Sequence, residues 1–422
     1  MKNSGIEWIG EIPESWELYK IGSLYHCRNE KVNDTDYPPL SVSKGGIVPQ
    51  MENVAKSDAN DNRKLVLKND FVINSRSDRK QSCGVSPLDG SVSLINTVLY
   101  TDNQETILPF YANLVMKNYG FAEEFYRWGH GIVADLWTTR WQEMKSIVLP
   151  LPDVKVQTRI IDCVEKKLSQ VDELIANQEK QIEKLKEYKQ SVITEAVTKG
   201  LDKSAPLKDS GIEWIGEIPA HWGIKRAKFL ANSFSKGSGI TKEDIVVEGD
   251  SPCVRYGEIY TKYDGSFDEC FTRTNLNKVS SPQYFSYGDI LFVCTGELVE
   301  EIGKNVVYLG KDNCLAGGDI IVMKHKQNPL YLSYALNSYI SQCQKSCNKA
   351  KLKVVHISAG DVGNVFIAIP SIEEQANIAN FLKVKCDGID RVIAIKQEKI
   401  EKLQEYKKSL IYEYVTGKKE VC

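Results

Sequence analysis

The sequence predicts an α+β chain in which two α/β globules alternate with two long helices. We expect the helices to pair as an antiparallel coiled coil, which gives the chain a pseudo-twofold and cyclic arrangement. First, residues 4–13, Ser-Gly-Ile-Glu-Trp-Ile-Gly-Glu-Ile-Pro, recur unchanged at 210–219, and a tryptophan follows each copy at the same distance. Second, residues 183–193 return in closely similar form at 401–411. Third, the segments between these shared elements are unrelated. A period of about 200 residues indicates duplicated domains and not a solenoid of small repeats.

Composition is that of a soluble protein with two or three domains. The formal charge of −2 over 422 residues argues against a nonspecific nucleic-acid coat, which needs a large positive field, but it leaves room for local basic clusters. The amino terminus lacks the apolar part of a secretory signal, and no run reaches the roughly 20 apolar residues that cross a bilayer. We therefore expect a cytoplasmic protein. The 11 cysteines are scattered, as expected of reduced thiols, and Cys343 and Cys347 lack the further ligands of a zinc site, so no metal is expected.

The two globules are expected at 1–150 and 210–369. Both are rich in short apolar runs separated by Gly, Pro, Asn and Asp, which is typical of strands, and each has a helix-like stretch towards its end. The predicted strands are 64–68, 71–74, 289–294, 305–309 and 319–323, and the predicted short helices are 109–127 and 329–345.

The long helices are expected at 151–200 and 370–422, with a linker at 201–209. No Gly or Pro interrupts residues 157–197, and both helices start with a proline five residues ahead of a glutamine. Apolar residues recur at heptad spacing with Glu and Lys between them, which predicts a coiled-coil seam. The seam residues are Ile161, Leu168, Ile175, Ile182 and Leu185 in the first helix and Leu382, Ile389, Ile393, Ile400 and Leu403 in the second. Because the intervening globule is too large for a tight turn, we expect antiparallel pairing, with the chain ends close together.

This order of elements closely resembles the specificity subunits of type I restriction–modification systems over essentially the whole chain. The most specific shared pieces are the duplicated Trp-Ile-Gly-x-Ile-Pro-x-x-Trp motif, the Pro-x4-Gln helix starts (Pro152/Gln157 and Pro370/Gln375) and the stretch Asp289-Ile-Leu-Phe-Val…Ala316-Gly-Gly-Asp-Ile-Ile. The usual Glu-Gln pair stands at Glu374-Gln375, but its counterpart in the first helix is Val156-Gln157.

The resemblance implies that each globule is a target recognition domain that reads one half of a split, asymmetric site in double-stranded DNA. The helices would set the spacing and dock two methyltransferase (M) subunits, and two restriction/translocase (R) subunits would join for cleavage. This chain would then have no catalytic residue and no cofactor, whereas the whole complex would use S-adenosylmethionine, ATP and Mg²⁺. Lys189 and Lys407 occupy seam positions, so we expect the helix pair to be incomplete there and to be finished by helices of the methyltransferase subunits.

Two basic segments of the first globule are candidates for DNA contact. Residues 74–81 follow a predicted strand, and their Arg, Lys and Gln side chains suit phosphates and base edges. Residues 128–140 combine glycines, which let the backbone approach a phosphate, with polar side chains. The competing interpretations are a solvated loop for the first and a structural turn packed by Trp128, Trp137 and Trp141 for the second. The candidate residues are Arg76, Arg79, Lys80, Gln81, His130 and Arg140.

The second globule has a glycine-rich basic segment at 235–242, whose amide donors suit a phosphate, and a lysine cluster at 345–353. A flexible loop and plain solvated charges are the competing interpretations. Arg255, Tyr256 and Thr295 at strand ends are weaker candidates. The candidates taken from this globule are Lys236, Ser238, Thr241, Arg255, Tyr256, Lys349, Lys351 and Lys353.

Two other classes of protein compete with this interpretation. Asp135, Glu143 and Lys145 have the loose spacing of a metal-dependent nuclease, a pattern that arises often by chance. A coiled-coil scaffold whose two globules bind protein or glycan would show no salt-dependent binding to duplex DNA. That second alternative leaves the two unrelated globules without a purpose.

Overall fold

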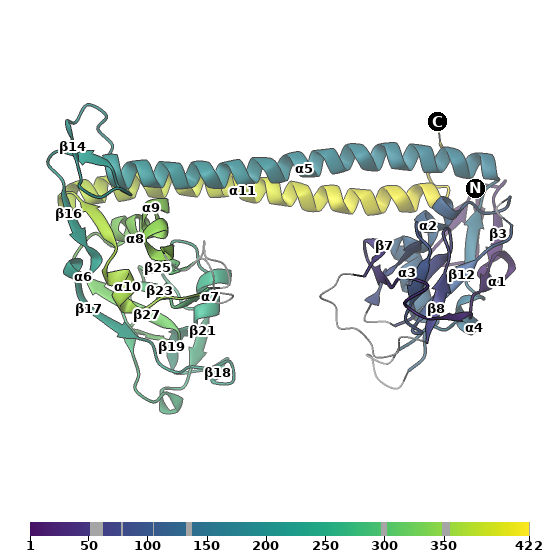
Figure 1. The fold of residues 1–422 in the computed structure, drawn as a ribbon, viewed down its shortest axis with the longest axis horizontal. Helices are drawn as coiled ribbons and strands as arrows, with labels where there is room; N and C mark the ends of the chain where they lie inside the picture. Colours follow the sequence, from purple (N-terminus) through teal and green to yellow (C-terminus); the bar gives the residue numbers. More distant parts are fainter. Residues whose placement is uncertain are drawn as a thin grey trace. The chain divides into compact units, whose positions relative to one another are not determined.

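The computed structural model describes residues 1–50, 62–76, 79–103, 105–131, 137–296, 302–347 and 355–421. The chain divides into two compact units (Figure 1). Unit 1 comprises Met1–Glu179 and Gln397–Cys422, and unit 2 comprises Lys180–Lys396. The predicted mixture of α and β structure is confirmed. The long helices α5 (Val154–Lys199) and α11 (Ile372–Val415) are both present, and each contributes one part to each unit.

Unit 1 is built on small antiparallel sheets. The largest has the order β10–β9–β12–β4 and the next β11–β8–β5. Their bounds are Cys83–Val85 (β10), Phe71–Asn74 (β9), Asn96–Tyr100 (β12), His26–Cys27 (β4), Gly90–Val92 (β11), Arg63–Val66 (β8) and Lys31–Val32 (β5). The strand pairs are β1 (Lys2–Asn3) with β2 (Glu11–Ile12), β3 (Glu17–Lys20) with β13 (Val148–Leu151), and β6 (Leu40–Ser43) with β7 (Gly46–Pro49). The short helices are α1 (Ile21–Leu24), α2 (Pro109–Lys117), α3 (Tyr119–Arg127) and α4 (Trp141–Met144).

Unit 2 contains two five-stranded sheets, with the orders β17–β27–β23–β25–β20 and β18–β21–β19–β26–β22. All neighbours are antiparallel except the parallel pairs β19–β26 and β20–β25. The first sheet comprises Ala231–Lys236 (β17), Ile320–His325 (β27), Ile290–Val293 (β23), Asn305–Tyr308 (β25) and Ser266–Phe267 (β20). The second comprises Ile245–Val246 (β18), Thr272–Thr274 (β21), Ser251–Val254 (β19), Cys314–Ala316 (β26) and Tyr284–Phe285 (β22).

Three strand pairs and six short helices complete the described part of unit 2. The pairs are β14 (Leu207–Asp209) with β15 (Glu217–Pro219), β16 (Gly223–Arg226) with β29 (Phe366–Ile369), and β24 (Thr295–Gly296) with β28 (Val355–His356). The helices are α6 (Ala227–Leu230), α7 (Tyr256–Thr261), η3 (Leu276–Lys278), α8 (Pro329–Asn337), α9 (Tyr339–Ser346) and α10 (Ala359–Gly363). Leu207–Asp209, at the end of the expected linker, is therefore strand β14.

Each predicted short helix is two helices in the structure. In unit 1 the chain leaves the helical conformation at Asn118, whose side chain accepts a hydrogen bond from the Phe121 N–H and so caps α3. In unit 2 Ser338 does the same for α9 by accepting from the Ser341 N–H. Asn and Ser favour such N-cap positions because their side chains satisfy amide groups that have no partner within the helix.

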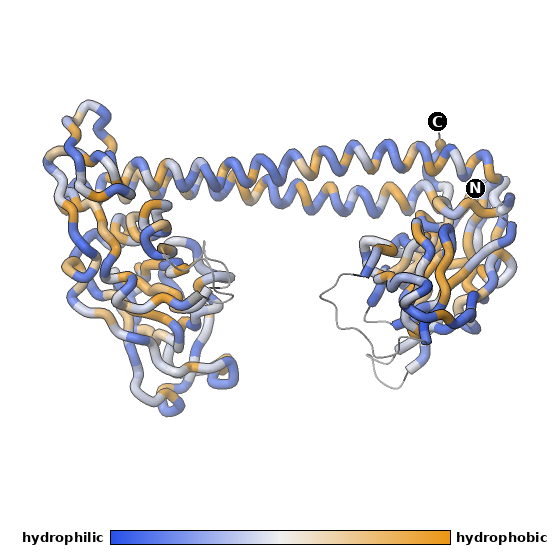
Figure 2. Tube along the Cα trace, in the orientation of Figure 1, coloured by the Kyte–Doolittle hydropathy of each residue, from blue (hydrophilic) through white to orange (hydrophobic). Residues whose placement is uncertain are grey.

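The cores of the two units include parts of both long helices. In unit 1 buried side chains of α2, α3, β9 and β12 pack together with Ile160 of α5 and Leu410 of α11. In unit 2, Ile193 of α5 and Leu382 of α11 lie in the same core as β23 and β27. Figure 2 shows hydrophobic positions gathered inside the β-rich parts and spaced along the long helices.

The two long helices contact each other in unit 1. The Cys163 thiol donates to the Tyr414 hydroxyl over 3.3 Å, and Asp172 accepts a hydrogen bond from Lys407. The residue number rises on α5 as it falls on α11, so this part of the pair is antiparallel. Ile161, Leu168 and Ile175 of the expected seam are half-buried here, together with Leu403 of α11, whereas Ile400 is buried.

In unit 2 the pairing is also antiparallel, because Gln181 contacts Lys396 and Lys189 contacts Asp390. Ile182, Leu382 and Ile389 of the expected seam are buried here, and Leu185 and Ile393 are half-buried.

The two seam lysines have acidic partners across the helix pair. Lys189 Nζ lies 2.7 Å from Asp390 and 3.4 Å from Asp264, and Lys407 pairs with Asp172. Burial acts to lower the pKa of Lys189, but its hydrogen bond to Asp390 and the nearby carboxylates outweigh burial, and the pKa is raised. Each ammonium group is therefore ion-paired within the chain, and the docking of methyltransferase helices at these positions stays a prediction.

The carboxyl-terminal segment packs on the first motif copy within unit 1. The Tyr412 hydroxyl donates to the Trp8 carbonyl over 3.0 Å, and Lys418 Nζ donates to the Ile9 carbonyl over 2.8 Å. Segments at opposite ends of the sequence therefore lie side by side. In the described residues no helix has the length and apolar character that a membrane span needs.

Candidate nucleic-acid interface

In unit 1 the structure brings the two candidate segments together. Arg76 is bridged to Thr138, and Thr138 exchanges two backbone hydrogen bonds of 3.0 Å with His130. The Thr139 N–H also donates to the Ser75 carbonyl over 3.0 Å. Residues 77–78 and 132–136 of these segments lie outside the described residues. Arg76, Arg79, Lys80, His130 and Arg140 are all exposed, and Gln81 is half-buried, so this adjoining pair of segments presents a basic surface.

Two of these candidates have structural duties. Lys80 Nζ lies 3.0 Å from Glu123 and 4.2 Å from the centre of the Tyr126 ring, so its ammonium group is held against α3. The Arg140 N–H donates to Glu143 Oε2 over 3.0 Å, and this contact caps α4. Glu143, named above for a possible nuclease, thus serves as a helix cap, and Asp135 lies outside the described residues.

The turn at Gly129 is a packing feature. A Cβ at Gly129 would lie 2.3 Å from Trp137 Nε1, so no side chain fits there. Trp137 Nε1 donates to the Tyr126 carbonyl over 2.9 Å, and Trp128 Nε1 donates to Glu124 over 2.8 Å. The structure supports the turn packed by tryptophans for this glycine, in place of a close approach to phosphate.

In unit 2 the glycine-rich segment lies against the turn after β26. The Ser238 N–H donates to the Ala316 carbonyl over 2.7 Å, and a Cβ at Gly237 would lie 2.0 Å from the Gly317 carbonyl oxygen. Gly317 in turn donates its N–H to the Val254 carbonyl, directly before Arg255. Two candidates that are distant in sequence, the 235–242 segment and Arg255, are therefore neighbours.

Ser238 is unsuited to DNA contact because it is buried. Its hydroxyl donates to the Ser281 carbonyl over 3.3 Å and accepts from the Gln283 N–H over 2.8 Å, so it ties two loops together. Thr241 is exposed, but both its N–H and its hydroxyl donate to Asp244 over 2.8 Å. Lys236 is exposed, and its ammonium group lies 3.9 Å from Asp319, too far for a hydrogen bond.

The lysine cluster at 345–353 divides into two parts. Lys349, Lys351 and Lys353 lie outside the described residues. Lys345 is buried, and its Nζ donates to the carbonyls of Gly303 and Leu336, each over 2.9 Å. Burial lowers the pKa of Lys345 to about 7. Lys345 is therefore a core residue, and its inclusion in a DNA-binding cluster is wrong.

Arg255 and Tyr256 lie at the point where β19 ends and α7 begins. Both side chains are at least partly accessible, and Tyr256 is exposed. Below them lies Glu258, which is 3% exposed. The sequence-based argument did not single out Glu258. A sequence signal for Glu258 was available. A Glu at the third position of a helix is typical of a helix cap, because its carboxylate can accept from the N–H of the residue that precedes the helix.

Thr295 contacts α7. The Tyr260 hydroxyl of α7 donates to the Thr295 carbonyl over 3.1 Å, and the Thr295 hydroxyl lies 3.1 Å from His356 Nδ1. Lys304 Nζ lies 5.7 Å from the centre of the Tyr260 ring.

Among the described residues, no group of three or more His, Cys, Asp or Glu side chains is arranged to hold a metal ion.

Two curated proteins with similar names resemble this chain in sequence. No family model matches the sequence. The chain is 24% identical to the putative type I restriction enzyme MjaX specificity subunit of Methanocaldococcus jannaschii, over 97% of this chain and 95% of that protein. It is 27% identical to the type I restriction enzyme MjaVIII specificity subunit of the same organism, over 65% of this chain and 62% of that one.

One of two similar solved structures shares the fold. One chain, from a study of complex assembly and conformational transition of the type I R-M system, superposes with a TM-score of 0.68 at 16% identity and covers 96% of this chain and 98% of its own length. The HsdS subunit from Thermoanaerobacter tengcongensis gives a TM-score of 0.49 at 17% identity, over 99% of this chain and all of that one. The chain is thus similar in sequence to two proteins named as specificity subunits of type I restriction enzymes, to one of them over nearly its whole length.

Proposed function

We propose that this chain is the DNA sequence-specificity subunit of a type I restriction–modification complex. The observation that carries the proposal is the match to a named specificity subunit over 97% of the chain. The duplicated frame supports it, because two identical ten-residue motifs border two globules of different sheet topology. Two different recognition globules joined by repeated motifs fit a DNA site whose two halves differ in sequence.

In unit 1 the reading surface would be the adjoining segments around Arg76 and His130. Arg76 and Arg79 are exposed there and can donate to guanine or to phosphate. Arg140 stands at the start of α4, beside the Thr138–Arg76 bridge. Lys80 contributes positive charge next to Glu123.

In unit 2 the reading surface would be the region around α7, with Arg255, Tyr256 and Lys236. The glycines at 237, 317 and 318 bring the 235–242 segment and the β26 turn within backbone contact, so three loops share one surface. Ser238 is buried and holds two loops of this surface together, so we do not assign it a contact with DNA. Thr241 and the lysines Lys349, Lys351 and Lys353 remain candidates from the sequence.

The long helices would act as the spacer between two globules arranged with pseudo-twofold, cyclic symmetry. At 46 and 44 residues they are long enough to set a separation by their length. Their outer faces would dock two methyltransferase subunits, and two restriction/translocase subunits would join for cleavage. S-adenosylmethionine, ATP and Mg²⁺ would be used by those subunits.

An apolar stripe on α11 supports docking of a partner. Phe381, Val384, Val392 and Ile395 are 37% to 71% exposed. With 3.6 residues per turn these positions fall on one side of the helix, which differs from the seam side of Leu382 and Ile389. Exposed apolar stripes of this kind mark protein interfaces.

The test is to co-express the chain with the methyltransferase subunit encoded beside it and to map methylated adenines across a genome by single-molecule sequencing. One split, asymmetric motif with a fixed spacer is the expected result. Removing one heptad from each long helix, in register, should change the spacer and leave both half-sites unaltered. A stable complex that yields no motif would contradict the proposal and favour the scaffold alternative, in which the globules bind protein or glycan.

A further inference from the structure

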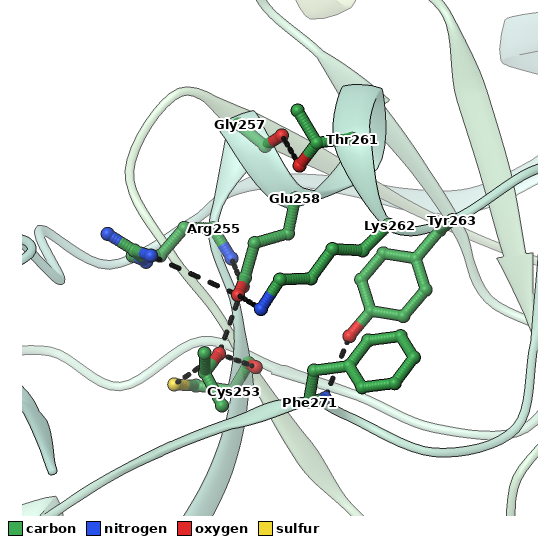
Figure 3. A network of polar contacts seen from close by, with 9 residues as sticks. Cys253, Arg255, Gly257, Glu258, Thr261, Lys262, Tyr263 and Phe271 are labelled. Carbon is green, nitrogen blue, oxygen red and sulfur yellow. Dashed lines mark hydrogen bonds and ion pairs between the residues drawn. The ribbon is translucent and has the colours of Figure 1, made fainter. Parts of the chain in front are cut away.

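The carboxylate of Glu258 is the centre of a polar network beneath the α7 surface (Figure 3). Its Oε2 accepts from the Arg255 N–H over 3.0 Å and from the Thr272 hydroxyl over 2.9 Å. Its Oε1 lies 3.2 Å from Lys262 Nζ and 3.9 Å from Arg255 Nη2. Figure 3 shows the carboxylate between the Arg255 guanidinium and the Lys262 ammonium group.

Helix capping alone does not explain this burial. A cap needs one acceptor for one backbone N–H, and such a carboxylate can remain in water. Burying a carboxylate is unfavourable unless cations and hydrogen-bond donors surround it. Glu258 is 3% exposed and has two cations beside it, whose side chains are 27% (Arg255) and 42% (Lys262) exposed. The anion is therefore hidden while its cations reach the surface, which leaves this surface positive.

The stem of Arg255 is fixed from its other side. A Cβ at Gly317 would lie 3.3 Å from Arg255 Cα and 3.4 Å from its Cγ, so the glycine turn packs directly on the arginine. Arg255 Nε is buried and has no hydrogen-bond partner among the described residues. The guanidinium group is thus held at its inner end by packing and lies beside Glu258 through Nη2. Such restraint suits bidentate recognition, in which two donors must meet two acceptors at fixed positions.

We propose that Glu258 is a positioning residue for base readout, which orients Arg255 so that it recognises one guanine in the half-site of unit 2. Guanine O6 and N7 in the major groove are the acceptors that match an arginine with a fixed stem. Glu258 itself does not touch DNA. Lys262, on the other side of the carboxylate, supplies charge towards the phosphates. This inference rests on the proposed function.

The test uses the chain in complex with its methyltransferase subunit, with methylome mapping followed by binding to duplexes substituted at each position of the mapped site. Glu258→Gln keeps the shape of the side chain and removes its charge. It should lower the preference for guanine at one position of one half-site about tenfold, the size of one lost bidentate contact. Arg255→Ala should relax the same position, and the double variant should be no worse there than Arg255→Ala alone. Glu269→Gln, an exposed substitution with the same charge change in the same unit, is the matched control and should leave every position unchanged.

Thr272→Val provides a second route if Glu258→Gln does not fold. It removes one hydrogen bond to the carboxylate from a residue that is 8% exposed and so does not contact DNA. It should relax the same guanine position to a smaller degree. A purely structural role for Glu258 would weaken binding to all sequences equally, and that result would overturn the inference, as would relaxation at a position different from that of Arg255→Ala. A wild-type complex without any motif would overturn the proposed function as well, whereas a wild-type motif that Glu258→Gln leaves intact would overturn this inference alone.

Discussion

The two motif copies have the same ten residues but different surroundings. Trp8 in unit 1 is 8% exposed, and Trp214, its counterpart in unit 2, is 51% exposed. Trp8 packs edge-on against Phe121, with ring centres 6.2 Å apart, and lies over Gly120. A Cβ at Gly120 would lie 3.0 Å from Trp8 Cε3, so a side chain at this position would require the indole to shift.

The corresponding helix of unit 2, α9, has no glycine at the position that matches Gly120. Helix α9 starts with Tyr339 as α3 starts with Tyr119, so Ile340 and Ser341 stand where α3 has Gly120 and Phe121. Ile340 has a side chain where Gly120 has none, and Ser341 offers no aromatic ring. The comparison teaches that an identical motif keeps its turn in both copies, whereas the burial of its tryptophan is decided by residues more than a hundred positions away.

The largest expected difference in stability is the one between the variants that lack Trp8 and Trp214. Trp8→Ala is expected to lower the free energy of unfolding by about 3–5 kcal/mol, as for other buried aromatic side chains. Trp214→Ala should cost less than about 1 kcal/mol because half of its surface is already in water. Denaturant unfolding of both variants tests this, and equal losses would mean that Trp214 is buried in solution.

A second difference between α3 and α9 concerns pH. Lys345 of α9 stands where α3 has Phe125, and burial lowers the pKa of Lys345 to about 7 from its ordinary value of 10.5. The folded state then binds fewer protons than the unfolded state between pH 7 and 10.5, so stability should rise with pH across that window. We expect a gain of roughly 2–4 kcal/mol between pH 7 and 10.

Lys345→Met is the control for the pH effect. The variant has no ammonium group to bury, so its unfolding free energy should rise less between pH 7 and 10 than that of the wild type. Parallel pH profiles for the two proteins would show that Lys345 does not titrate in this range.

Gly120→Ile installs in unit 1 the residue that unit 2 has. The added side chain should displace Trp8 and cost about 1–3 kcal/mol, as overpacking does in other cores. Tryptophan fluorescence should shift to longer wavelength as the indole enters water. Ile340→Gly, the reverse change, should not bury Trp214, because Ser341 still offers no ring to pack against.

The smallest expected change in stability concerns Glu374, which stands where the first copy has Val156. Glu374 accepts from Trp222 Nε1 and lies beside His221, each over 3.0 Å, whereas the first copy has Val156 at this place. Glu374→Val should cost about 1–2 kcal/mol through the lost hydrogen bond of Trp222. Val156→Glu is the matched change in unit 1, and thermal unfolding of both shows whether the two copies tolerate the exchange.

The periodic features of the fold could be predicted from the sequence, and the single buried polar residues could not. Heptad spacing predicted both long helices, because a seam requires apolar residues at that period along its whole length. The absence of Gly and Pro from residues 157–197 gave further support for the first helix, whereas the second contains Gly388. The division of 109–127 at Asn118 was missed, since an Asn within an apolar pattern gives only a local signal for a cap. Ser238 and Lys345 resembled surface residues because their partners, Ser281 and Gly303, lie far away in the sequence. The helix cap formed by Glu258 had a local sequence signal, but its burial did not, because Thr272 completes the network only after the strands have paired.

Unit 1 is made of two pieces from opposite ends of the chain, whereas unit 2 is continuous. Buried side chains of Leu410, Tyr414 and Val415 belong to the core of unit 1, so this core is incomplete until the ribosome has made residues 410–415. Unit 2 has all of its residues once Lys396 has been made. Domains usually fold in the order of their synthesis. Here the order should be reversed. Nascent chains that end at Lys396 and are stalled through an added linker long enough to span the exit tunnel should protect unit 2 from protease while unit 1 is still cut.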